Sequence, residues 1–323
     1  MTPAPSPDVA EIATVKVDGR PQADPDVQCY HPMRPILKWA GAGLGLALAA
    51  GVATEVLGSR GFTRLVQGDV RALLDQALGP EASASPVSAE MLAPLPDPVR
   101  RYLAWTGVVG QPIPRMVRLR QRGRMRLGRG QPWWPLDAVQ HYSVRPPGFV
   151  WVGTLGCGPL RLARARDMYQ GGRGRMLVRL GSHFSVVDAE GKEMDQGAMT
   201  RYLSEMVWFP AALLGANVSF EAVDGSSARV ILNDHGHTVA GTLHVDANGR
   251  PTDFVTARQR MQGETSRLAT WSTPMTAYGT LAGLRLPVEG RAVWKLAGGD
   301  LEYFEVRVTE LTYDPGPGVA ACE

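Results

Sequence analysis

From Pro114 to Tyr313 the chain largely follows a period of two, and this pattern limits the fold more than any other feature. The stretch MVRLRQRGRMRL alternates strictly, with apolar or small side chains on one face and five arginines on the other. Successive side chains of a strand point to opposite faces of a sheet, so the pattern predicts a half-buried antiparallel strand. Similar segments recur, separated by Gly or Pro. We expect about ten such strands, joined as hairpins.

One stretch, residues 199–214, interrupts this pattern with MTRYLSEMVWFPAALL. Its apolar residues recur with helical spacing, and Pro210 predicts an end or a kink. The expected fold class is therefore α+β and mainly antiparallel β, with a curled or open-barrel sheet around this central helix. A sheet curled around a helix gains a concave, mostly apolar interior, the geometry in which hydrophobic ligands bind.

The N-terminal part differs in character. Residues 1–32 contain six prolines and no apolar period, which predicts a disordered leader. Residues 33–58 contain the apolar run 36–57, whose 22 positions would span ~33 Å as a helix, about the thickness of a bilayer core.

Three interpretations of this run stay open. It is a single transmembrane helix with Lys38 at the cytoplasmic interface, a secretory signal that starts at Met33, or a buried Gly- and Ala-rich helix. The first two place the rest of the chain outside the cytoplasm. Whether the segment is cleaved is left open.

Residues 59–110 are expected to form a helical connector. It holds an amphipathic helix over 63–78 and a short helix in LPDPVRRYLAWTG, with Asp97 as cap, Pro98 at the first position and Gly107 past the end. The β domain follows over 111–314, and residues 315–323 are a tail.

Composition adds two limits. With 323 residues and 44% hydrophobic content the chain can bury a sizeable core. Thirty of its 34 basic residues are Arg, so Arg-rich stretches carry little signal. Cys29, Cys157 and Cys322 lie in different parts of the chain and suggest no stapling pair.

Five residues of the central helix are the candidate ligand-binding set: Arg201, Glu205, Met206, Trp208 and Phe209. Arg201 and Glu205 are four positions apart in an apolar neighbourhood. Glu205 is either a pocket carboxylate that binds a polar head group or acts as a general base, or half of an ordinary helical ion pair.

Other motifs are weaker. His235 and His237, with His244 farther along, suggest a metal or catalytic pair, but Asp and Gly beside them favour a solvated turn. Gly171 to Gly174 lack the Lys and helix of a phosphate loop and predict a hairpin tip. We expect no metal and no cofactor.

The seven arginines from Arg115 to Arg129 have no acid among them. Nucleic acid is a poor partner for an exported chain, so the alternatives are anionic lipid head groups and a solvated outer face.

Two segments, LPDPVRRYLAWTG at 95–107 and RYLSEMVWFPAALLG at 201–215, resemble the motifs of a bacterial family of unknown function that often carries an N-terminal membrane segment. The resemblance covers roughly residues 60–314 and implies no activity. More distantly, the strand-rich body is similar to periplasmic lipid carriers, in which an unclosed barrel wraps helices around an apolar cavity.

The leading hypothesis is a non-catalytic binding protein for a lipid or other hydrophobic ligand. It is held at the cytoplasmic membrane by a single N-terminal pass, with its C-terminal domain outside the cytoplasm. One alternative is a structural envelope protein with a fully packed core and an unknown protein partner. The other is an enzyme that uses Glu205 or the His235/His237 pair.

Overall fold

The computed structural model describes residues 58–78, 86–157, 160–181, 184–262 and 265–316. The predicted leader at 1–32, all but the last residue of the predicted membrane segment at 33–58, and most of the tail lie outside this range. Within the described residues, no helix combines the length and apolarity needed to cross a membrane.

Fourteen strands of the described residues join one antiparallel sheet, more than the ten expected. The first six are β1 Met116–Met125, β2 Trp134–Ser143, β3 Gly148–Cys157, β4 Leu160–Gln170, β5 Arg173–Leu180 and β6 Phe184–Glu190. The other eight are β7 Val218–Ala222, β8 Ser227–Asp234, β9 His237–Val245, β10 Pro251–Gln262, β11 Thr265–Ser272, β12 Met275–Leu281, β13 Leu284–Lys295 and β14 Leu301–Tyr313.

The strand order shows how the chain builds the sheet. It runs β6-β5-β4-β3-β2-β1-β14-β13-β11-β10-β9-β8-β7, with β12 beside β13. The first half of the domain is laid outward from the centre, and the second half is laid from the far edge back to the centre. The first and last strands, β1 and β14, therefore meet in the middle of the sheet.

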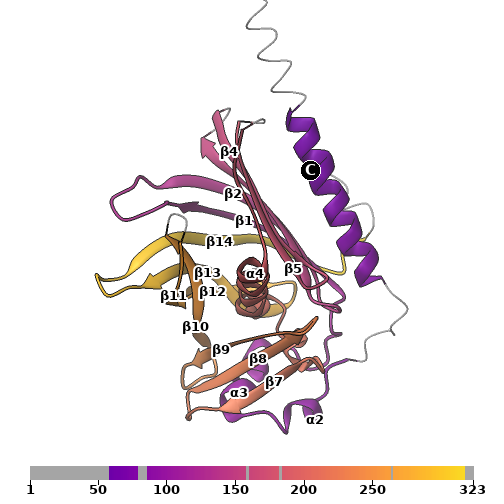
Figure 1. The fold of residues 1–323 in the computed structure, drawn as a ribbon. Helices are drawn as coiled ribbons and strands as arrows, with labels where there is room; N and C mark the ends of the chain where they lie inside the picture. Colours follow the sequence, from indigo (N-terminus) through magenta and orange to yellow (C-terminus); the bar gives the residue numbers. More distant parts are fainter. Residues whose placement is uncertain (1–57, 79–85, 158–159, 182–183, 263–264, 317–323) are drawn as a thin grey trace, which may run out of the picture. The chain divides into compact units, whose positions relative to one another are not determined.

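The sheet curves around helix α4 (Figure 1). The helix spans Lys192–Glu205 and is followed by two 3-10 turns, η1 Met206–Trp208 and η2 Pro210–Leu214. The predicted bounds of 199–214 are corrected at both ends. Pro210 lacks the N–H that would bind the carbonyl of Met206, and its ring would clash there, so the α-helix stops before it.

The start of α4 is marked by a backbone conformation and a hydrogen bond. Gly191 precedes it with a φ of 114°, a conformation that side chains disfavour. In the first turn, the Asp195 carboxylate accepts a hydrogen bond of 2.7 Å from the backbone N–H of Gly174 in β5. These turns are short of large apolar residues, which is why the sequence pattern places the helix too late.

Three further helices precede the sheet. Residues 58–77 form an amphipathic helix on the outer face of β3 and β4, where Val70, Leu73 and Val150 form a small buried cluster. The buried Arg166 of β4 binds Asp69 of this helix at 2.6 Å. The short α2 spans Ala89–Leu92, and α3 spans Asp97–Thr106.

α3 confirms most of its predicted boundary. Gly107 follows it in the left-handed conformation, and Pro98 lies at its start. Asp97 is the first helical residue and not the cap, and its carboxylate binds Arg100 and Arg101. The buried Tyr102 donates its hydroxyl to the carbonyl oxygen of Val207 at 3.2 Å, which joins α3 to the central helical segment.

Candidate functional site

The inner face of the sheet presents two rows of side chains to α4. Gln140, Trp151 and Asp167 are register partners across β2, β3 and β4. Two residues along each strand, Tyr142 and Phe149 form the next row, which Tyr169 completes. The period of two places both rows on one face.

Arg201 and Glu205 of α4 bind this inner face and each other. The Arg201 Nε donates to Glu205 Oε1 at 2.8 Å, and its Nη1 donates to Asp167 Oδ2 at 2.7 Å. Gln140 Nε2 and the Tyr142 hydroxyl both donate to Glu205 Oε2, at 2.7 and 3.0 Å. The helical ion pair of the sequence prediction is therefore confirmed, and the sheet extends it into a network.

Aromatic rings cover the guanidinium of Arg201. It lies 5.1 Å from the ring centre of Phe149 and 5.0 Å from that of Trp151, within cation-π range. Burial disfavours the charged form, but Glu205 and Asp167 outweigh this effect and raise the pKa of Arg201. Burial, then Glu205, raise the pKa of Tyr142. The network is thus a charged, hydrogen-bonded clamp between helix and sheet.

The other three candidate residues take different places. Met206, Trp208 and Phe209 are all buried. The Trp208 indole N–H donates to the carbonyl oxygen of Pro287 at 3.0 Å. Phe209 packs against Tyr142, with ring centres 4.7 Å apart. Phe209 thus separates the polar network from the space on its other side.

That space is a cavity of about 220 Å³. Its walls are Val108, Gln111, Pro112, Pro114, Phe209, Pro210, Ala211, Ala282, Leu284, Tyr313 and Asp314. Protein cavities of ~150 Å³ bind a benzene ring, whereas sites for drug-sized ligands measure ~300–1,000 Å³. The cavity therefore suits one apolar group of a ligand, such as a ring or a short stretch of acyl chain.

Polar groups lie at one side of this cavity. The Asp314 carboxylate accepts hydrogen bonds from the backbone N–H groups of Arg115 and Met116, at 2.8 and 2.9 Å. The Tyr313 hydroxyl donates to the carbonyl oxygen of Trp208 at 2.6 Å. These bonds fix the walls where β14 ends.

The histidine motif forms a tight turn between β8 and β9. His235 and Gly236 both have positive φ, 46° and 79°, as a two-residue hairpin turn requires. His235 Nδ1 lies 3.0 Å from Asp234 Oδ1, and the Tyr169 hydroxyl donates to Asp234 Oδ2 at 2.7 Å. Within the described ranges no group of three or more His, Cys, Asp or Glu is arranged to hold a metal ion.

Arginines of strand β1 form ion pairs with acidic residues of the two neighbouring strands, β2 and β14. Arg122 binds Asp137 of β2 at 3.1 Å, and Arg124 binds Glu305 of β14. Arg118, expected on the solvated face, is instead buried, with 8% exposure, and lies 3.9 Å from Glu310. Three arginines of the stripe are therefore paired with acids of the neighbouring strands.

Sequence reasoning missed Gln140, Tyr142 and Asp167. The only signal was their polar character at inward positions, where most neighbouring side chains of the same face are apolar. Which helix they meet depends on the register between distant segments. Sequence reasoning expected an apolar interior around the helix, but not a cavity in this position, whose walls come from four separate parts of the chain.

Comparisons with known proteins give a family and distant structural likenesses. The sequence model of a family described as a family of unknown function (DUF6544) matches residues 85–306, a range that contains both motifs. No curated protein matches the chain. Among solved structures, the chain is similar to a DUF1329 family protein from Desulfovibrio piger, at 10% identity and a TM-score of 0.37, over 63% of this chain and 87% of that one. It is also similar to a LolA superfamily protein from Nitrosomonas europaea, at 8% identity and a TM-score of 0.38, over 73% and 98%.

Proposed function

The chain belongs to this family of unknown function, so we propose a function from its own geometry: a membrane-tethered, extracytoplasmic protein that binds a lipid or another hydrophobic molecule without covalent chemistry. The observation that carries the proposal is the apolar cavity of about 220 Å³ beside Phe209. An apolar group that enters a preformed pocket with mostly apolar walls is removed from water, which favours binding.

Within this proposal the five candidate residues have two roles. Phe209 contacts the apolar group directly as a wall of the cavity. Arg201 and Glu205 hold α4 against the sheet, and Met206 and Trp208 lock the turn that follows it. Arg201 and Glu205 thus support the wall, because Tyr142 contacts both Glu205 and Phe209.

A neutral fluorescent probe, N-phenyl-1-naphthylamine, tests the cavity. The full chain should bind it, and Ala211→Phe, which adds a ring beside the cavity, should weaken binding at least ~10-fold, since a filled site excludes the ligand. Ala222→Phe is the matched control, because Ala222 is exposed on β7. Equal binding by all three proteins would reject the cavity as the site. The milder Ala211→Val covers the case in which the larger residue prevents folding.

The tether has a separate test. An alkaline phosphatase fusion after residue 60 should be active if the predicted segment places the domain outside the cytoplasm. An inactive fusion after residue 60, together with an active alkaline phosphatase at the N-terminus, would show the opposite orientation, with the domain in the cytoplasm. Mass spectrometry of the purified full chain should also find a co-purifying lipid.

One observation favours the structural alternative. The charged groups of Arg201 and Glu205 all have partners inside the protein, so they offer a ligand little that is free. If the probe does not bind and native-membrane crosslinking recovers a stoichiometric protein partner, the domain is an interaction module with a packed core.

A further inference from the structure

We infer that the end of the sheet where β5 ends and β6 begins, marked by Leu180 and Phe184, rests on the surface of a lipid bilayer. This inference depends on the tether of the proposed function. It adds an orientation and a second membrane contact, made by strands of the folded domain.

The first observation is where the described chain begins. Helix 58–77 starts at the same end of the sheet as the described ends of β4 and β5 (Figure 1). Arg164 of β4 donates to the Ser59 hydroxyl and to the Thr63 hydroxyl, at 3.3 and 3.4 Å. The apolar run 36–57 precedes residue 58 directly. If that run spans a bilayer, residue 58 lies at the membrane surface, and so do the strand ends beside it.

The second observation is that these strand ends expose large apolar side chains. Leu180 and Phe184 are cross-strand partners, and they are 47% and 75% exposed. Leu162, 42% exposed, lies at the same end of the sheet but on its opposite face, because its neighbour Ala163 is the register partner of Leu180. Val187, 39% exposed, lies farther along β6 on the face of Leu180 and Phe184, since its register partner is Val178. Exposed apolar patches of this kind mark contact surfaces in soluble domains.

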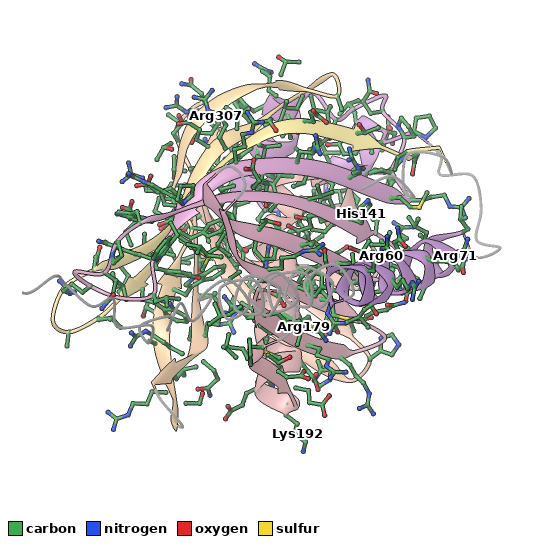
Figure 2. All side chains as sticks on the ribbon, turned by 90° about the horizontal axis from the view of Figure 1, so that it is seen from above. Arg60, Arg71, His141, Arg179, Lys192 and Arg307 are labelled. Atoms are coloured by element: carbon green, nitrogen blue, oxygen red, sulfur yellow. The ribbon has the colours of Figure 1, made fainter. Side chains whose placement is uncertain are left out.

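The third observation is charge. Residues 58–68 contain Arg60 and Arg64, both exposed, and no acid. Arg164 and Arg179 lie over the buried ring of Phe62, at 4.3 and 5.7 Å from its centre. Figure 2 shows Arg60 on this helix and Arg179 nearby. Apolar side chains beside a basic cluster match the acyl boundary and anionic head groups of a bilayer.

β6 is also an edge strand of the sheet, exposed on both faces. An edge strand can pair with a strand of another protein. Helix 58–77, which directly follows the proposed tether, starts nearby, and basic residues lie beside it. Both favour the bilayer over a strand of another protein as the partner of this surface. A second copy of this chain at β6 is an outcome that the test must recognise.

Nitroxide labels on the full chain test the inference. Cys29, Cys157 and Cys322 are first replaced by Ser, and one label is then placed through Phe184→Cys. The matched control is Glu190→Cys at the other end of the same strand, where six residues of extended chain separate the two by ~20 Å. The protein is reconstituted in vesicles of phosphatidylcholine and phosphatidylglycerol.

In vesicles, we expect the label at 184 to show a several-fold higher ratio of oxygen accessibility to nickel-complex accessibility than the label at 190. After proteolytic release of the domain from the vesicles into detergent-free buffer, the two labels should show the same ratio. Equal ratios in membrane-bound protein would overturn the inference. Spin–spin broadening at 184 would assign β6 to a second copy instead. Alkaline carbonate extraction tests the tether separately from the contact made by the strand ends. Protein that carbonate releases from the membrane would show that the tether is absent, whichever ratio the labels give.

Discussion

Glu205 accepts hydrogen bonds from three different side chains, one from its own helix and two from β2. Its side chain is only 12% exposed, so water replaces few of these bonds when they are lost. Removing one member of a buried, paired set leaves the remaining members desolvated and unsatisfied. The cost of a substitution here should therefore depend on whether the new side chain still accepts hydrogen bonds.

We expect Glu205→Leu to lower the free energy of unfolding by about 2–4 kcal/mol, and Glu205→Gln by less, because Gln retains one acceptor. Urea denaturation of each variant measures the change. Arg122→Gln serves as control, since the Arg122 and Asp137 side chains are 78% and 73% exposed and should contribute little. A Glu205→Leu protein as stable as the wild type would mean that the network is dispensable.

Glu305 gives a pH dependence. Hydrogen bonds from Arg124, at 2.5 and 2.8 Å, lower the pKa of Glu305 from 4.5 to about 2. A carboxylate with a lowered pKa in the folded state stabilises the protein above its unfolded pKa, and this contribution is lost as the pH falls through the folded pKa.

Stability should therefore fall more steeply between about pH 4.5 and pH 2 in the wild type than in Glu305→Gln. Urea unfolding at several pH values measures both slopes. Arg124→Gln should flatten the wild-type slope in the same way. Identical slopes for the wild type and both variants would show that this pair does not titrate as described.

At the scale of elements, most strands follow from alternation, and the exceptions have physical causes. β12 contains Gly279 and follows Pro274, so its sequence resembles the Gly- and Pro-containing segments that separate the expected strands. The first half of α4 is mostly polar and lacks an apolar period, and the small Ala198 stands where β5 approaches the helix closely. Alternation also predicts that Gln140 and Asp167 face inward. It does not predict that they contact Arg201, because that contact depends on how segments far apart in the chain pack, with Gln140 and Arg201 separated by 61 positions.

The contact between β5 and α4 can be tested at Gly174. A Cβ there would lie 2.4 Å from the Met194 carbonyl oxygen and 2.8 Å from the Ala198 Cβ. Gly174→Ala should therefore displace α4 and destabilise the protein by about 1–3 kcal/mol. Gly298→Ala is the control, because a Cβ at Gly298 meets nothing within 4 Å. Urea denaturation of the two variants measures the difference, and equal stabilities would contradict the close approach.

At the scale of the molecule, the sheet has a strong centre and two exposed ends. β1 pairs along almost its whole length with both β2 and β14, whereas β6 and β7 end the strand order. In hydrogen exchange followed by mass spectrometry, amides of β1 and β14 should exchange slowest and those of β6 and β7 fastest, since local opening begins where few neighbours hold the chain. Protection of β6 equal to that of β1 in the isolated protein would contradict this order.

The place of β14 beside β1 sets a condition on how the protein is made. Thr309 contacts the carbonyl oxygen of Arg120, 189 residues earlier in the chain. At ~5–20 residues per second, a ribosome delivers β14 about 10–40 s after β1. Until β14 is made, β1 lacks its partner on that side, and charged side chains such as its alternating arginines disfavour pairing of an open edge with another chain.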